Sequence, residues 1–122
     1  MKKILLLLLL LSTKTFCQTS KNESKLNQAE TEAFILKETK EGGKLDFFTP
    51  IKGKEYNGFQ IKPGIYASNI EIALYKWGKT NYELGIEKLD DVLEIFVKYK
   101  GRELNGKEKS LIKMGFDREL EK

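Results

Sequence analysis

Four carboxylates lie close together in the second half of the sequence, at Glu87, Asp90, Asp91 and Glu94. Separations of three and four residues place side chains on one side of a helix, where they can share a cation or act as an acid and base pair. Catalytic carboxylates, however, need burial or a like-charged neighbour to shift their pKa values, and these residues flank an apolar stripe. We interpret the group as a solvated helix face and keep a carboxylate-dependent hydrolase as the third functional hypothesis.

The stretch Ser110-Leu111-Ile112-Lys113 matches the Ser-x-x-Lys spacing, which sets a serine hydroxyl beside a lysine in penicillin-binding proteins and β-lactamases. Those enzymes need two further motifs, and the nearest stretch, 79–81, reads Lys-Thr-Asn where they have Lys-Thr-Gly. The chain contains no histidine, which removes the commonest general base and the Ser-His and Cys-His arrangements. We therefore expect a protein that is not an enzyme and that has no metal site and no cofactor.

The best candidate for ligand binding is the stretch Tyr75-Lys76-Trp77-Gly78-Lys79, because an aromatic ring beside lysines can stack on a sugar or hold a cation. Tyr75, Trp77 and Lys79 are therefore the candidate ligand contacts. Trp77 also completes the apolar face of a predicted helix, and we favour a core position for its ring, with the indole N–H bonded to a nearby carbonyl. The other aromatic among basic residues, at 98–102, is expected to be a helix end with its long side chains lying along the surface.

A second group of large apolar residues lies between residues 44 and 67, together with both prolines, Pro50 and Pro63. Proline and glycine break helices, so this segment is expected to contain turns that join short extended pieces, with Asn57-Gly58 as a two-residue turn. We expect the large side chains to form a layer on the helices rather than an exposed binding surface. They are Phe47, Phe48, Tyr56, Phe59, Ile61, Ile65 and Tyr66.

The first 17 residues have the order of a secretory signal peptide. Lys2 and Lys3 precede an unbroken apolar run over 4–11 and a more polar exit over 12–17. The apolar run is too short to span a bilayer, which takes about 20 residues in a helix. Small side chains at Thr15 and Cys17 match the cleavage pattern, so we predict that residues 1–17 are removed on export to the periplasm or the medium.

Cys17 is also the residue that a lipid anchor would use. Acylation favours an aliphatic residue three positions before the cysteine and a very small one just before it, whereas Lys14 and Phe16 stand there. We therefore expect no lipid anchor and no transmembrane segment after cleavage, and keep a lipoprotein anchored through Cys17 as the alternative. Cleavage would leave no cysteine for disulfides, thiolate catalysis or metal binding.

Cleavage would leave 105 of the 122 residues, which is enough for one domain with its own core. The three lysines among the first 17 residues would be lost, and the formal net charge would fall from +4 to +1. A nearly balanced chain offers no cluster of cations to neutralise phosphates, so we expect no nucleic-acid partner.

Hydrophobic periodicity predicts helices on both sides of the 44–67 segment. After a flexible tail at 18–23, a first helix is expected over 24–41, ended by Gly42-Gly43. Capping boxes that begin at Ser68 and Thr80 predict helices over 69–77 and 81–100.

A tight turn at 78–80 would make these two helices an αα-hairpin. Asn105-Gly106 is expected to form a turn, followed by one helix interrupted at Gly115 or by two short ones. The expected fold is mainly α: a small single domain over 24–122 with about four helices around the central αα-hairpin. The irregular, aromatic-rich 44–67 segment, with possible short strands, would lie between the first and second helices.

The absence of histidine and cysteine chemistry favours a protein-interaction module, such as an inhibitor, an immunity-type protein or an envelope assembly partner. Its partner would be another envelope or secreted protein. The second hypothesis is a carbohydrate- or cell-wall-binding module that uses Trp77 and exposed tyrosines.

Overall fold

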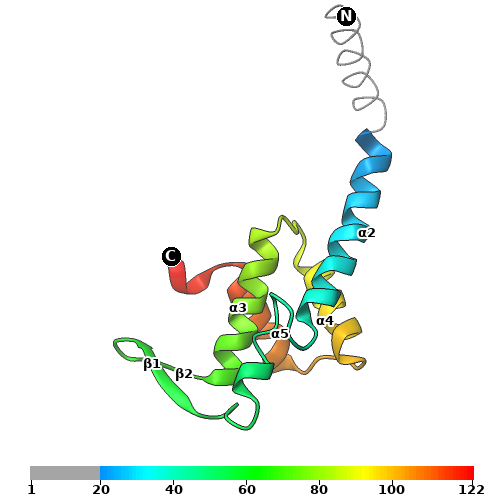
Figure 1. Cartoon of the computed structure of the whole chain (residues 1–122). Helices are drawn as coiled ribbons and strands as arrows, with labels where there is room; N and C mark the ends of the chain where they lie inside the picture. The colour runs from blue at the N-terminus through cyan, green and yellow to red at the C-terminus, as the bar shows by residue number, and fades with distance from the viewer. Residues whose placement is uncertain (1–19) are drawn as a thin grey trace, which may run out of the picture. The chain divides into compact units, whose positions relative to one another are not determined.

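Over residues 20–122, one helix, a loop with a β-hairpin and three further helices follow one another (Figure 1). The computed structural model describes residues 20–122, with side chains from residue 28 onward. The elements are α2 (Ser20–Thr39), β1 (Gly58–Lys62), β2 (Ile65–Ser68), α3 (Asn69–Glu83), α4 (Leu89–Lys100) and α5 (Gly106–Phe116), with 3-10 turns η1 (Thr49–Ile51) and η2 (Glu119–Glu121). The predicted fold class is confirmed, since the described chain is mainly helical and its short strands lie between the first two helices.

Helix α2 spans the boundary between two units of the chain, one ending at Ala33 and the other covering Phe34–Lys122. It begins at Ser20, inside the predicted tail at 18–23, and ends at Thr39 rather than at residue 41. None of the described helices is long and apolar enough to cross a membrane. The predicted signal peptide at 1–17 and the alternative anchor at Cys17 lie outside the described residues.

The core of the second unit is built around Trp77, which has no exposed surface. Its ring lies 4.7 Å from that of Phe96, measured between centroids. The indole N–H donates to the Thr39 hydroxyl at 3.0 Å, and this hydroxyl donates to the Ile35 carbonyl at 2.5 Å. The predicted core position of Trp77 is confirmed, and a hydroxyl rather than a carbonyl satisfies its N–H.

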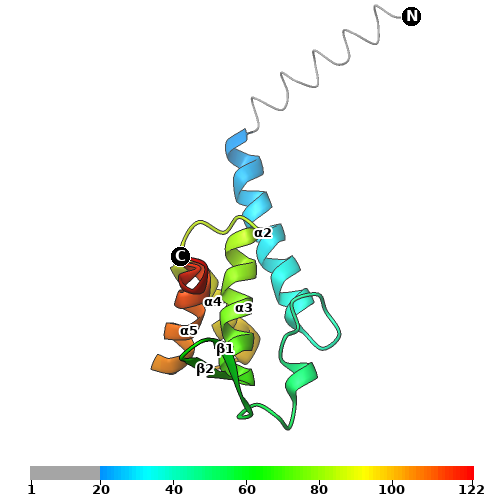
Figure 2. The ribbon, with the colours of Figure 1, turned by 90° about the vertical axis from the view of Figure 1, so that its left-hand side faces the viewer.

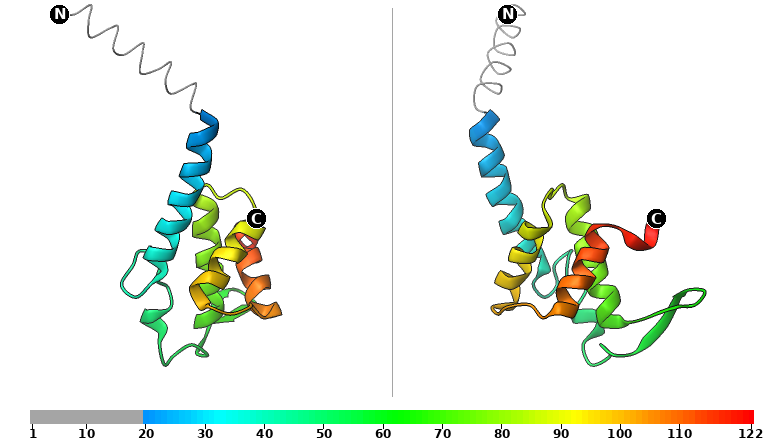
Figure 3. Two further views of the ribbon diagram at one scale, coloured as in Figure 1. Left: turned by 90° about the vertical axis from the view of Figure 1, so that its right-hand side faces the viewer. Right: turned by 180° about the vertical axis from the view of Figure 1, so that it is seen from behind.

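Helices α3 and α5 lie side by side and are in close backbone contact at two glycines (Figures 1 and 3). A Cβ atom added to Gly115 would lie 1.9 Å from the Tyr75 carbonyl oxygen, and one added to Gly78 would lie 2.2 Å from the Ile112 carbonyl oxygen. Both distances are far below van der Waals contact, so only glycine, which has no side chain, lets the helices come this close. We call this contact the α3–α5 crossing.

The crossing explains why two predicted helix boundaries are wrong. Helix α3 continues through the predicted turn at 78–80 to Glu83, and α4 begins only at Leu89. Thr80 does not start a helix; its hydroxyl donates to the Lys76 carbonyl within α3, at 2.8 Å. Gly115 likewise lies inside one continuous helix, α5. At Gly78 and Gly115 the missing side chain serves packing rather than helix termination.

The two strands form an antiparallel hairpin that projects from the start of α3 (Figures 1 and 2). Its turn is Pro63-Gly64 rather than the predicted Asn57-Gly58, because Lys62 pairs with Ile65 across it. Proline before a glycine with positive φ, here +79°, is typical of a type II turn. Asn57 instead accepts the Asn69 backbone N–H at 2.9 Å, which ties the base of the hairpin to α3.

Candidate functional sites

The three predicted contact residues do not share an open surface. Trp77 is fully buried, so its ring offers no face to a sugar in this conformation. The Tyr75 hydroxyl donates to the Glu121 carboxylate and accepts the Leu120 backbone N–H at 2.9 Å. The Lys79 ammonium pairs with the same carboxylate at 2.6 Å. Tyr75 and Lys79 therefore hold the C-terminal turn η2 against α3.

The carboxylate group and Ser110 show no second feature of a catalytic site. The four carboxylates are exposed, and so is Ser110 on α5. Lys113 pairs with Asp117 at 2.8 Å. No cluster of three or more potential metal ligands occurs in the part of the chain that the structure describes.

The β-hairpin exposes several large apolar side chains. Phe59, Ile65 and Tyr66 are 51%, 41% and 71% exposed, and Tyr56, just before β1, is 88% exposed. We call these four residues the hairpin surface. The expected layer over the helices is therefore wrong for them, because the hairpin projects from the helices instead of lying on them.

Two of the remaining residues of that segment, Phe47 and Phe48, behave as expected. Phe47 and Phe48 are half-buried and pack against the core, and Ile61 is half-buried within β1.

Both faces of the hairpin carry exposed side chains, although Ile61 and Ala67 are half-buried and the Lys62 ammonium donates to the Leu120 carbonyl. The register pairs Phe59 with Ala67 and Gln60 with Tyr66, which places Phe59 and Tyr66 on opposite faces because side chains alternate along a strand. The sheet has two strands, so within the described residues no third strand pairs with its outer edges. An open edge with exposed aromatic side chains favours addition of an extended segment from another chain.

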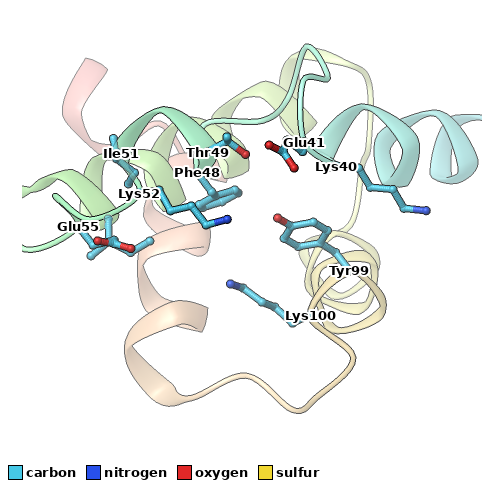
Figure 4. A pocket seen from close by; sticks show the side chains of 10 residues that line it. Lys40, Glu41, Phe48, Thr49, Ile51, Lys52, Glu55, Tyr99 and Lys100 are labelled. Carbon is cyan, nitrogen blue, oxygen red and sulfur yellow. The ribbon is translucent and has the colours of Figure 1, made fainter.

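A hollow of about 380 Å³ opens between the 40–55 loop and the end of α4 (Figure 4). Its lining combines lysines with aromatic rings, and we call it the lysine–aromatic pocket. Charged and aromatic residues of its lining include Glu41, Phe48, Lys52, Glu55, Tyr99 and Lys100.

Asp46 holds the loop that forms one wall of this pocket. Its carboxylate accepts the backbone N–H groups of Gly42, Phe48 and Thr49 at 3.0, 3.1 and 2.9 Å. Burial raises the pKa of Asp46, but these hydrogen bonds together hold it below its ordinary value. The charged carboxylate therefore fixes the loop that places Phe48 in the pocket.

The aromatic side of the pocket is formed by Phe48 and Tyr99, which pack on the buried ring of Phe96. The Phe48 ring lies 5.7 Å from Phe96 and 6.0 Å from Tyr99, with 27° between the Phe48 and Tyr99 planes. The Lys100 ammonium is 5.7 Å from the centroid of each of the three rings, within range of a cation–π interaction. Gly101, with φ +70°, ends α4 directly after Lys100, as the sequence predicted for this helix end.

The Tyr99 side chain is half-buried, and its hydroxyl finds no hydrogen-bond partner among residues 28–122. Burial raises the pKa of Tyr99, and the negative charge of Asp46 raises it further. The phenol therefore keeps its proton at neutral pH and is available as a donor.

Sequence patterns alone indicated neither site clearly. The pocket joins residues 48 and 52 to residues 99 and 100, and helical periodicity contains no signal for such a long-range pairing. The hairpin did leave a signal, since Pro63-Gly64 lies between two short runs of alternating residues. No family model, curated protein or solved structure matches the chain.

Proposed function

We propose that this protein is an exported, non-catalytic interaction module that docks on its partner through the hairpin surface. Export rests on the signal-like order of residues 1–17. The docking role rests on one observation, the projecting hairpin with Phe59, Ile65 and Tyr66 exposed. Large exposed apolar side chains beside an open strand edge favour protein binding, because covering them contributes about 25 cal/mol per Å² of apolar area.

The partner that fits this surface is an extended apolar segment of another exported protein, flanked by acidic residues. The open strand edges offer unpaired backbone groups, so an extended segment can add as a third strand. A cation beside the hairpin favours acidic neighbours, since Lys54 at its base is exposed.

The test replaces Tyr66, and separately Phe59, with the photo-cross-linking residue p-benzoylphenylalanine in living cells. Met114, 37% exposed on α5, provides the matched control position. We expect one discrete cross-linked protein from the hairpin positions and none from Met114. Mass spectrometry then identifies this protein for purification.

Binding of the purified partner decides the proposal. Tyr66→Ala and Phe59→Ala are each expected to weaken binding by about tenfold or more, because aromatic residues dominate interface energies, whereas Met114→Ala leaves it unchanged. Hairpin variants that bind as tightly as the wild type contradict the proposal. A cross-linked product made of two copies of this chain also contradicts it.

The carbohydrate-binding hypothesis now depends on its exposed tyrosines alone, without Trp77. Tyr56 and Tyr66 are the most exposed rings, at 88% and 71%, whereas Trp77 is buried. Cosedimentation with purified peptidoglycan and with cellulose tests it. Retention of the wild type together with loss of Tyr66→Ala would favour glycan binding over a protein partner.

A further inference from the structure

We propose that the lysine–aromatic pocket binds a small organic anion, in which a carboxylate or a phosphate monoester is attached to a flat apolar or aromatic group. The pocket shares no residue with the hairpin surface, so this proposal stands apart from the proposed function. Its volume of about 380 Å³ lies within the range of small-molecule sites.

Two ammonium groups define where the charge of the ligand belongs. Lys52 and Lys100 extend toward the same hollow in Figure 4, from the loop and from the end of α4. Neither forms an ion pair with a carboxylate of residues 28–122. Like charges that face one hollow repel each other, and an anion between them relieves this repulsion.

The aromatic wall explains why the ligand carries a flat apolar group. Phe48 and Tyr99 are both half-buried and stacked, and Figure 4 shows their rings beside the two ammonium groups. A ring placed against them gains aromatic packing in addition to the charge interaction. An inorganic anion has no such contact and is expected to bind more weakly.

Tyr99 adds a hydrogen-bond donor to the same hollow. Its hydroxyl points into the pocket in Figure 4 and has no partner among the described residues. A neutral phenol donates to a carboxylate or phosphate oxygen, and such hydrogen bonds to an ionised acceptor are stronger than those between neutral groups.

Glu41 and Glu55 restrict the position of the anion. Both line the pocket, and Figure 4 places the Glu41 carboxylate on the side opposite Lys100. They repel an anion that approaches them, so the charged group has to lie between Lys52 and Lys100. Removing the charge of Glu41 should therefore strengthen anion binding.

The test is an NMR titration of the purified protein that follows backbone amide shifts with four probes: benzoate, phenyl phosphate, inorganic phosphate and benzyl alcohol. Benzoate and phenyl phosphate are expected to give saturable shifts at residues 47–52, Tyr99 and Lys100. Their relative affinities decide between a carboxylate and a phosphate ligand. Inorganic phosphate should bind at least several-fold more weakly, and neutral benzyl alcohol should give no saturable shift.

Substitutions in the pocket identify the side chains that bind the anion. Lys52→Gln and Lys100→Gln should each weaken aryl-anion binding by about tenfold, Tyr99→Phe by a few-fold, and Glu41→Gln should strengthen it by a few-fold. Lys109→Gln, an exposed lysine on α5 outside the pocket, is the matched control and should bind as the wild type does. Lys52 lies in a loop, so its variant remains informative if Lys100→Gln disturbs folding.

Three results overturn the proposal. The first is the absence of saturable shifts at the pocket with both aryl anions. The second is equal binding by benzyl alcohol, which would show that the pocket selects only apolar groups. The third is unchanged affinity in Lys52→Gln, which would show that the two ammonium groups do not hold the anion.

Discussion

A single methyl group at Gly115 tests the α3–α5 crossing directly. In an exposed helix alanine is more favourable than glycine by about 1 kcal/mol, so helix propensity alone predicts that Gly115→Ala stabilises the protein. The structure predicts the opposite. The new Cβ atom would lie 1.9 Å from the Tyr75 carbonyl oxygen and 2.8 Å from the carbonyl carbon, and both are backbone atoms of α3.

The size of the effect follows from how far the helices have to move. Ordinary contact begins at 3.4 Å, so the two backbones have to separate by roughly 1.5 Å at this point. That separation loosens the packing of Leu74, Ile112 and Phe116, which are buried in the core. Overpacking usually costs about 1–3 kcal/mol, and here backbone rather than a flexible side chain has to yield. After subtracting the gain in helix propensity, we expect Gly115→Ala to lower the free energy of unfolding by about 2 kcal/mol.

Urea unfolding measures this loss, followed by the fluorescence of buried Trp77 and by far-UV circular dichroism. A loss of about 2 kcal/mol corresponds to a decrease of about 8 °C or more in Tm for a domain of this size. Gly106→Ala is the matched control, because a Cβ atom at the first residue of α5 would meet nothing within 4 Å. Its stability should equal or slightly exceed that of the wild type.

A Gly115→Ala variant as stable as the wild type, with an unchanged m-value, would refute the close backbone contact. Gly78→Ala is the reciprocal test from the other helix, since its Cβ atom would lie 2.2 Å from the Ile112 carbonyl oxygen. Both substitutions have to destabilise the protein. A loss of stability in only one of the two variants would mean that α3 and α5 are not in backbone contact at both glycines.

Three further substitutions test other contacts. Arg102 donates two hydrogen bonds of 2.9 Å to Glu108. These bonds are the main reason why the pKa of Glu108 lies below its ordinary 4.5, although burial raises this pKa. Glu108→Gln should therefore lower the free energy of unfolding by about 1–2 kcal/mol at pH 7. This loss should shrink as the pH falls below 4.5, because the wild type then loses the charged form of Glu108. Urea unfolding of both proteins at pH 7 and pH 3 measures the loss, and an equal loss at both pH values contradicts the prediction. Thr39→Val leaves the buried N–H of Trp77 without its acceptor and should cost about 1–3 kcal/mol; an unchanged Tm would argue against this bond. Tyr75→Phe releases the η2 turn and should speed amide hydrogen exchange there, while Tm changes little; unchanged exchange would show that the hydroxyl does not hold the turn.

Local hydrogen-bond patterns were the most predictable part of the fold. The capping box at the start of α3 is present, with Ser68 and Glu71 each bonded to the backbone N–H of the other. The start of α5 obeys the same rule through Asn105 and Glu108, although we assigned Asn105-Gly106 to a turn. These boxes leave a signal in the sequence because their residues lie three positions apart, although the same spacing at Thr80 and Glu83 falls inside α3 and forms no box.

The glycines show why the remaining helix boundaries were harder to predict. Gly101 ends α4 with φ +70°, and the sequence indicated this end correctly. Gly78 and Gly115 belong to the same residue type, yet they lie inside helices and serve the α3–α5 crossing. Only knowledge of which helices meet distinguishes the two uses, and that information is tertiary.

The candidate sites were less predictable for a related reason. The hairpin surface and the half-buried Phe48 come from one aromatic-rich segment, and composition cannot tell which rings the core will cover. The pocket depends on the loop that Asp46 closes and on the end of α4, which are far apart in the sequence. Individual residues that could bind a ligand can be recognised in the sequence, but which of them lie together in space cannot.

Because α3 and α5 meet through main-chain atoms at Gly78 and Gly115, their contact depends little on which side chains face outward. Exposed positions such as Lys76, Lys109 and Met114 can then be labelled with dyes or affinity tags, or substituted with charged residues, without disturbing this contact. Within this pair of helices, the contact itself tolerates no side chain at Gly78 or Gly115, whereas the outward-facing positions are open to substitution.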